Sequence, residues 1–217
     1  MNLSSLARAL LVSLALLALS LVACTSRKGS DAAAEAATTA LAREPSAAPE
    51  RQKPSAQETA ILAGGCFWGM EELLREIPGV IETSVGYSGG KTKDPTYEDV
   101  SGGASGHAES VRVVFDPTKI SYADLLENWF FRMHDPTTSN RQGNDVGTQY
   151  RSAIFVTSPE QKRIAEEVKA RVDKSGKWKS PIVTEIVAAG PFTPAEEYHQ
   201  KYLVKNPGGY TCHYMRD

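Results

Sequence analysis

A lone cysteine interrupts the sequence GGCFWGMEELL, which begins at Gly64. Cys66 follows a short apolar run that ends in glycines, and it precedes apolar residues at helical spacing. We therefore expect Cys66 where a strand becomes a helix, next to unpaired amide groups that stabilise a thiolate. The thiolate is the reactive form of cysteine. The alternative is a buried structural cysteine, because free cysteine is among the most buried residue types.

A carboxyl group is expected on the buried face of a later strand. The sequence ESVRVVFDP alternates, so Glu109 shares its parity with Val111, Val113 and Phe115. Burial raises the pKa of a carboxyl group, and a carboxylic acid that is neutral at pH 7 can serve as a general acid. The alternative is a residue at the strand end whose side chain reaches solvent.

The chain has three cysteines, Cys24, Cys66 and Cys212, and none forms a CxxC pair, so no cysteine-based zinc site is expected. Cys24 belongs to a lipidation signal described below, which leaves Cys66 and Cys212 in a protein predicted to be exported. A structural disulfide is the default interpretation of such a pair. Cys212, however, follows Gly208 and Gly209 near a loose terminus, where a crosslink would constrain little. A mobile cysteine beside a reactive one is typical of a resolving thiol, which converts an oxidised cysteine into a disulfide.

Alternating strand and helix patterns must position these residues. Strands are expected within 59–64, 80–90, 109–117, 151–157 and 182–189, and helices within 67–77 and from Ser121, Ser158 and Thr193. The polar stretch 135–150 shows no element and is expected to be a functional loop. The order of elements predicts an α/β (α+β) fold, a ferredoxin-like two-layer sandwich with a split β-α-β core, extra helices and a long coiled C-terminal tail.

The N-terminal quarter has a different composition. Residues 1–23 have the pattern of a signal peptide, and the sequence LVAC resembles the lipobox of bacterial lipoproteins, which predicts lipidation of Cys24. An ordinary signal peptide cut nearby and a permanent N-terminal anchor are the alternatives. Residues 24–57 contain almost no large apolar residues and are expected to form a disordered tether, with the catalytic domain spanning 58–217.

These features predict an exported protein, lipid-anchored in the cell envelope. Thr25 stands where an aspartate often marks retention at the inner membrane, which favours the periplasm-facing outer membrane. The net charge of −2 predicts no nucleic-acid partner. We expect a monomer.

Six motifs in this order resemble peptide-methionine (S)-S-oxide reductase type A, from about Thr59 to the end of the chain. They are GCFWG at 65–69, PTY at 95–97, GHAE at 106–109, HDPT at 134–137, RQGNDVGTQYRS at 141–152 and NPGGYTC at 206–212. The resemblance implies thiol-dependent reduction of the S epimer of methionine sulfoxide, protein-bound or free, and so the repair of oxidised proteins in the envelope.

The resemblance also implies residue roles. Cys66 attacks the sulfoxide sulfur while Glu109 protonates the oxygen, and Cys66 is left as a sulfenic acid. Cys212 then forms a Cys66–Cys212 disulfide, which a thioredoxin-like protein reduces, without a metal or another cofactor. The resemblance also implies that Tyr97 and Tyr150 contact the sulfoxide oxygen and that Phe67 and Trp68 contact the substrate methyl group. It implies that Asp145 helps to order the site and its water.

Two other functions fit parts of the sequence. One is a cysteine hydrolase or acyl transferase that pairs Cys66 with His107 or His199, which leaves Cys212 unexplained. The other is a non-catalytic lipoprotein with a stabilising Cys66–Cys212 bridge. A lone histidine is weak evidence without a partner, so we expect His107 to be structural.

Overall fold

A computed structural model describes residues 57–217 of the chain. The predicted signal peptide, Cys24 and almost all of the predicted tether lie outside these residues. Within residues 57–217, no helix is both long and apolar enough to cross a membrane.

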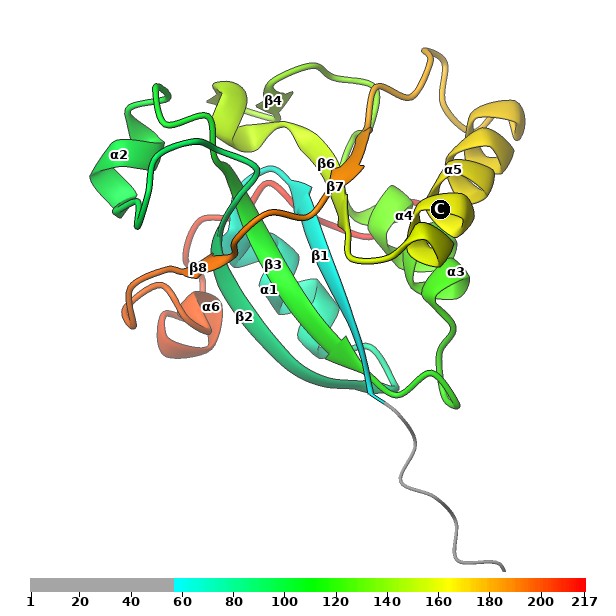
Figure 1. Cartoon of the computed structure of the whole chain (residues 1–217), viewed down its shortest axis with the longest axis horizontal. Coiled ribbons are helices and arrows are strands. Elements are labelled where there is room, and N and C mark those ends of the chain that lie inside the picture. The colour runs from blue at the N-terminus through cyan, green and yellow to red at the C-terminus, as the bar shows by residue number, and fades with distance from the viewer. Residues whose placement is uncertain (1–56) are drawn as a thin grey trace, which may run out of the picture. The chain divides into compact units, whose positions relative to one another are not determined.

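A six-stranded sheet forms the centre of the described chain, in the order β7-β6-β1-β3-β2-β8 (Figure 1). Its strands are β1 (Glu58–Gly64), β2 (Val80–Ser88), β3 (Ala108–Phe115), β6 (Ser152–Val156), β7 (Glu185–Ala188) and β8 (Thr193–Pro194). All neighbours are antiparallel except β6 and β7. The inner order β6-β1-β3-β2 is that of a split β-α-β unit, which confirms the predicted ferredoxin-like core.

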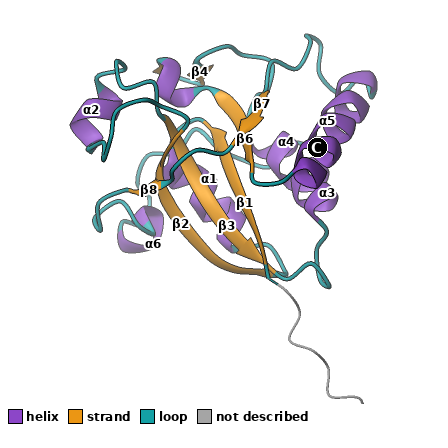
Figure 2. Ribbon diagram, viewed as in Figure 1, coloured by secondary structure: helices purple, strands orange, loops and turns teal. Residues whose placement is uncertain are grey.

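The two faces of the sheet are covered differently. Helix α1 (Phe67–Arg75) packs behind β2 and β3, where Met70 and Leu74 are fully buried as their helical spacing predicts (Figure 2). The segment between β7 and β8 crosses the opposite face, where Phe192 packs against a small buried cluster that includes Phe155 (Figure 1). The side chains of Val111, Val113 and Phe115 lie in the α1 layer of the core, so the predicted strand parity is confirmed.

The second predicted helix begins at Ser121, whose side chain accepts a hydrogen bond from the Asp124 amide. It comprises α3 (Tyr122–Asp124), the π-helical segment η1 (Leu125–Phe130) and α4 (Phe131–Met133). A π-helical turn is wider than an α-helical one and rotates the residues that follow it. Phe130 and the neighbouring Phe131 are both fully buried, and Trp129 is half-buried.

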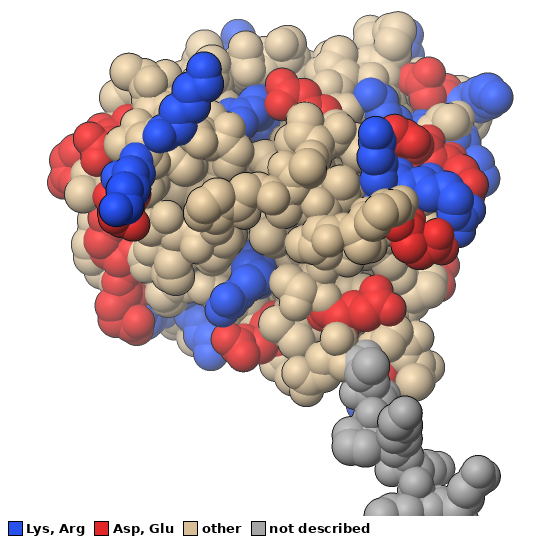
Figure 3. All heavy atoms as spheres, viewed as in Figure 1, with Lys and Arg blue, Asp and Glu red and all other residues tan. Residues whose placement is uncertain are grey.

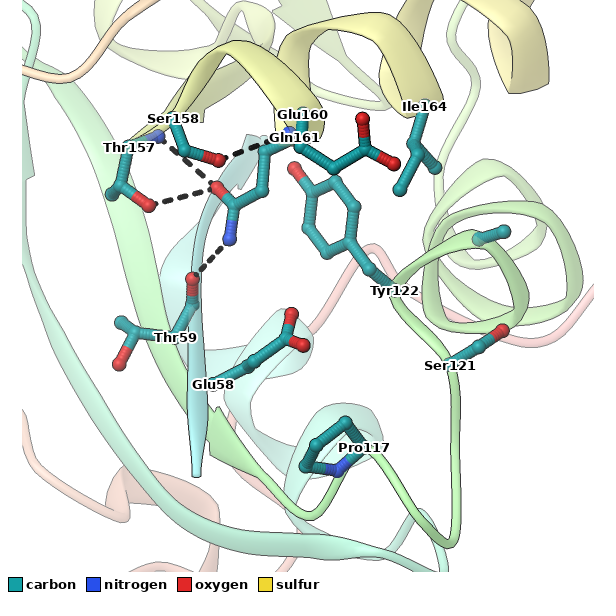
Figure 4. A pocket seen from close by; sticks show the side chains of 11 residues that line it. Glu58, Thr59, Pro117, Ser121, Tyr122, Thr157, Ser158, Glu160, Gln161 and Ile164 are labelled. Carbon is teal, nitrogen blue, oxygen red and sulfur yellow. Dashed lines mark hydrogen bonds between the residues drawn. The ribbon is translucent and has the colours of Figure 1, made fainter. Parts of the chain in front are cut away.

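Helix α5 (Pro159–Lys174) begins as predicted, with Ser158 accepting a hydrogen bond from the Gln161 amide. The Gln161 side chain accepts from the Thr157 amide and donates to the Thr59 carbonyl, so it joins the start of α5 to β1 (Figure 4). On the outside of α5, Arg163 pairs with Glu160 and Glu167. In the face shown in Figure 3, basic and acidic side chains are interspersed in this region.

The predicted helix from Thr193 is wrong. Thr193 and Pro194 form β8 at the edge of the sheet, and the only helix in this part of the chain is the short α6 (Tyr202–Lys205). Glu196, three residues after Thr193, accepts hydrogen bonds from the Tyr87 hydroxyl and the Tyr97 amide instead of capping a helix. Contacts with distant residues have replaced the local capping that the sequence favours.

Short elements within predicted loops carry several polar residues. The stretch 135–150 contains a hairpin of β4 (Arg141–Gln142) and β5 (Asp145–Val146), followed by the 3-10 turn η2 (Thr148–Tyr150). Helix α2 (Tyr97–Ser101) was not predicted, and Thr96 and Asp99 cap it through a reciprocal capping box.

Candidate active site

Cys66 is the N-cap residue of α1, at the predicted junction between a strand and a helix. Gly65 before it has a φ of 109°, which disfavours any residue with a side chain. A Cβ atom at Gly65 would also lie 2.6 Å from Cβ of Gln142. The glycine therefore allows the β4 hairpin to approach the turn that carries the thiol.

The resting form of Cys66 differs from our expectation of a thiolate. Its side chain is only 7% exposed, and burial, followed by the charge of Glu109, raises the pKa of the thiol far above its ordinary value. The Trp68 amide at the start of α1 lowers that pKa but does not offset burial. Cys66 is therefore a neutral thiol at pH 7 until a proton acceptor is supplied.

Glu109 lies on β3 beside this thiol and is 2% exposed. Burial raises the pKa of its carboxyl group to about 8, against a hydrogen bond from the Phe67 amide that lowers it. The charge of Asp145 raises it further. The predicted buried, neutral carboxylic acid is present, which excludes a solvent-exposed strand end.

Tyr97 on α2 and Tyr150 on η2 approach the same carboxyl group from separate elements. Burial raises the pKa of both hydroxyls, with the charge of Glu109 as the second cause in each case. Both residues are half-buried, so each side chain is partly accessible. The structure thus brings together Cys66, Glu109 and two phenol groups that can donate hydrogen bonds.

Cys212 lies next to Asp145, with 3.4 Å between its Sγ atom and Oδ2. Both described cysteines are free thiols. Burial raises the pKa of Cys212 to about 11, and the Cys66 amide, which faces the Cys212 sulfur, lowers it. The two thiols therefore belong to one site, although they are 146 positions apart in the sequence.

The tail that carries Cys212 is held more firmly than its composition predicts. His213 is buried, and its Nε2 donates a hydrogen bond to the Gly64 carbonyl at 2.8 Å. Gly69 on α1 has no side chain to obstruct this contact, since a Cβ atom there would clash with Thr211 Oγ1 and lie 2.7 Å from His213 Nδ1. The last glycine of GCFWG thus admits the tail to the start of α1.

Comparison with known proteins identifies this arrangement. The family described as "Peptide methionine sulfoxide reductase" matches residues 58–217. The chain belongs to this family, whose type A members are called MsrA. It is accordingly an oxidoreductase that reduces peptide-methionine (S)-S-oxide.

Individual relatives agree with this assignment. Peptide methionine sulfoxide reductase MsrA 1 of Mesorhizobium japonicum is 58% identical over 73% of this chain and 90% of its own length. Mxr1 from Saccharomyces cerevisiae in its reduced form has a TM-score of 0.71 at 40% identity, covering 76% of this chain and 95% of that one. Mxr1 in complex with Trx2 has a TM-score of 0.51 at 26% identity, covering 78% and 96%.

The aromatic residues of this MsrA chain form one wall beside Cys66. Trp68 donates a hydrogen bond from Nε1 to Nδ1 of His199 at 3.0 Å, and its ring stacks on Tyr202 at a centroid distance of 3.8 Å. The ring of Phe67 lies 5.2 Å from that of His199, and the ring of Tyr97 lies 4.5 Å from it. The structure thus joins both predicted substrate-contacting aromatics to one buried histidine.

Sequence reasoning missed the structural role of this segment. His199 was considered only as a partner for Cys66 in a hydrolase, and Glu196 was not considered as a partner of Tyr87 or Tyr97. The hydrophobic pattern of the segment is weak, so no periodicity indicated that it packs on α1. The one signal in the sequence was a histidine flanked by tyrosines. This pattern indicates an aromatic cluster only when α1 is already known to lie opposite the segment.

The histidines do not support a hydrolase. His107 accepts a hydrogen bond from the Gly90 amide and contacts the Thr92 carbonyl at 2.8 Å, which is the structural role we expected. Nδ1 of His199 is occupied by Trp68. Membership of the MsrA family decides against this alternative.

A separate hollow lies away from these thiols. It has a volume of about 630 Å³ and is lined by residues at the starts of β1, α3 and α5, including Glu58, Tyr122 and Gln161 (Figure 4). It contains none of the residues assigned to the MsrA site. In the part of the chain that the structure describes, no cluster of three or more histidine, cysteine or acidic side chains could hold a metal ion.

Proposed function

We propose that the residues around Cys66 carry out methionine sulfoxide reduction in two thiol steps. The observation that supports this proposal most strongly is the pair formed by Cys66 and Glu109: a buried thiol beside a buried carboxyl group that is protonated at neutral pH. Sulfoxide oxygen leaves readily only when it is protonated, so a neutral acid beside a nucleophile meets the requirement of the step.

In the first step, the proton of Glu109 moves to the sulfoxide oxygen, and the hydroxyls of Tyr97 and Tyr150 donate hydrogen bonds to that oxygen. The Cys66 sulfur attacks the sulfoxide sulfur, and its own proton returns to Glu109. The sulfur–oxygen bond of the substrate and the transient bond between the two sulfur atoms then break, and the hydroxyl group passes to the Cys66 sulfur to give a sulfenic acid. Methionine leaves with two more electrons on its sulfur, and Cys66 has lost two.

In the second step, the Cys212 sulfur attacks the Cys66 sulfenic acid, a disulfide forms and water leaves. The Cys212 thiol donates a hydrogen bond to Oδ2 of Asp145, 3.4 Å from Sγ, so Asp145 can receive the thiol proton. A thioredoxin-like dithiol then reduces the disulfide by exchange and becomes oxidised itself. The complex of Mxr1 with Trx2 supports this class of reductant.

The substrate is proposed to lie against the aromatic wall. Phe67 and Trp68 hold the substrate methyl group, and Asp145 helps to order the site and its water.

We further propose that this reductase repairs oxidised proteins in the cell envelope, tethered through a lipid on Cys24. This proposal rests on the signal-peptide pattern of residues 1–23 and on the sequence LVAC before Cys24. Intact-mass measurement of the detergent-extracted protein tests it, since a free thiol at Cys24 would refute lipidation.

Thiol counting tests the reaction. Reduced protein is mixed with free methionine sulfoxide and no external reductant, and thiols and methionine are measured together. We expect two thiols to disappear for each methionine released. Methionine release without loss of thiols, or no release at all, would refute the two-thiol scheme.

A further inference from the structure

Glu71 is a buried carboxyl group that the proposed reaction does not use. It lies one helical turn after Trp68 on α1 and is only 1% exposed. Its Oε1 accepts a hydrogen bond from Thr83 Oγ1 at 3.1 Å, and its Oε2 accepts one from the Lys201 amide at 2.7 Å. Burial of a carboxyl group is costly unless it makes such bonds, so an apolar residue would be the simpler choice for packing alone.

The Lys201 amide belongs to a strained turn. Lys201 has φ 51° and ψ 42°, in the left-handed region that residues other than glycine rarely adopt. Such a conformation persists only where the surrounding structure holds it in place. The hydrogen bond to Glu71 attaches this turn directly to α1.

The residues on either side of the turn hold the indole of Trp68. His199 accepts the hydrogen bond from Nε1, which fixes the edge of the ring. Tyr202 stacks on its face, with 12° between the two ring planes. One segment therefore contacts α1 at two neighbouring points, the Glu71 carboxyl group and the Trp68 ring, which are three residues apart and lie on one side of the helix.

We propose that Glu71 is a positioning residue: it holds the turn at Lys201 so that His199 and Tyr202 fix the orientation of Trp68. The function of that orientation, holding the substrate methyl group, rests on the role proposed for Trp68 above. Loss of the carboxyl group frees the Lys201 amide, the turn relaxes, and the indole loses its two constraints together.

The experiment compares Glu71→Leu with Glu71→Gln in a protein that carries Trp129→Phe and Trp178→Phe, so that Trp68 is the one remaining tryptophan. Leucine removes both acceptors. Glutamine keeps an oxygen for the Lys201 amide, and its amino group can donate to the Thr83 hydroxyl. Acrylamide quenching of Trp68 fluorescence reports its exposure, and single-turnover methionine release reports the half-saturating sulfoxide concentration and the limiting rate.

We expect Glu71→Leu to raise the quenching constant at least twofold and the half-saturating concentration about tenfold, with the limiting rate within threefold of the parent. Glu71→Gln should remain within twofold of the parent in both measurements. Should the leucine variant fail to fold, Glu71→Asp replaces it, because its shorter side chain cannot reach Thr83 and Lys201 together. It should shift both measurements in the same direction.

A matched control separates positioning from general loss of stability. Gln161 is also buried and joins a helix start to β1, far from Trp68, so Gln161→Leu should destabilise the protein without changing the quenching of Trp68. Unchanged quenching in Glu71→Leu, equal loss in the leucine and glutamine variants, or the same change in Gln161→Leu would overturn the proposal. Trp68→Ala tests the substrate role separately, because a normal half-saturating concentration in that variant would refute the role. The quenching measured in the Glu71 variants would still decide whether Glu71 positions Trp68.

Discussion

The amide of Phe67 donates a hydrogen bond to Oε2 of Glu109 over 3.0 Å. This bond connects the first residue of α1 to the carboxyl group that we propose as the acid, so the residue after the nucleophile also positions the proton donor. It occupies one carboxyl oxygen and leaves the other to carry the proton. It also limits the effect of burial, so the pKa of Glu109 rises to about 8 and no further.

Glu109→Gln should slow single-turnover methionine release by roughly 10²–10⁴-fold, the usual contribution of a general acid. Glutamine keeps the shape and can donate a hydrogen bond, but it cannot transfer a proton. The wild-type rate should also fall as pH rises through about 8, where Glu109 ionises, and the variant should lack this decrease. Identical rates and pH profiles in the two proteins would show that the proton comes from another group.

The same pKa predicts a pH-dependent stability. The folded-state pKa of about 8 lies above the ordinary value of 4.5, so between these pH values the folded state holds a proton that the unfolded chain has lost. The contribution of Glu109 to the free energy of unfolding therefore falls as pH rises through this range, by up to about 4 kcal/mol. Urea denaturation of wild type and Glu109→Gln at pH 5 and pH 8 measures it. A pH-independent difference between the two proteins would contradict the burial argument.

Cys66→Ser should abolish methionine release, because Cys66 is the thiol at the start of α1 beside Glu109. A serine hydroxyl is far less nucleophilic and cannot form a sulfenic acid. Methionine is measured after one enzyme equivalent of sulfoxide, with circular dichroism to confirm folding. Any burst of product from the folded variant would mean that the nucleophile is misassigned.

Cys212→Ser should separate the two thiol steps. Methionine release in a single turnover should remain near the wild-type rate, since that step needs only Cys66. Cycling with a thioredoxin and its reductase should stop, because no disulfide can form. Sustained turnover of this variant with thioredoxin would show that Cys212 is not an obligatory resolving thiol.

Gly69→Ala should slow disulfide formation more than methionine release. Alanine favours the helix, yet its Cβ would meet Thr211 and His213 and displace the tail that carries Cys212. We expect the second thiol to be lost at least tenfold more slowly, as measured by quenched-flow thiol titration. Gly190→Ala is the matched control, because a Cβ atom there meets nothing within 4 Å. Equal effects in the two variants would exclude this contact as the cause.

Local rules were sufficient for the regular part of the fold. The alternation along β3 placed Glu109 on the buried face, and the capping residues Ser121 and Ser158 marked the starts of two helices. These local rules failed where residues distant in the sequence bind the groups that a helix cap would use. Thr193 and Glu196 satisfy a capping pattern, but β2 and Tyr97 provide stronger partners for them in the folded chain.

In the candidate active site, too, some features could be predicted from local sequence and others depend on distant contacts. The place of Cys66 could be predicted from neighbouring residues, whereas its raised pKa could not, because burial depends on how the hairpin at Gln142 and the tail at His213 close over it. Cys212 is also held more firmly than Gly208 and Gly209 led us to expect. The buried contact between His213 and Gly64 holds the residue directly after Cys212.

The direction of β1 gives the enzyme an orientation. This strand starts at Glu58, where the preceding part of the chain joins it, and ends at Gly64, two residues before Cys66 (Figure 1). Seven residues of strand span roughly 23 Å. The point of attachment and the reactive sulfur therefore lie at opposite poles of the sheet. A protein that presents a methionine sulfoxide to Cys66 therefore approaches the end of β1 opposite to the one at which the strand begins.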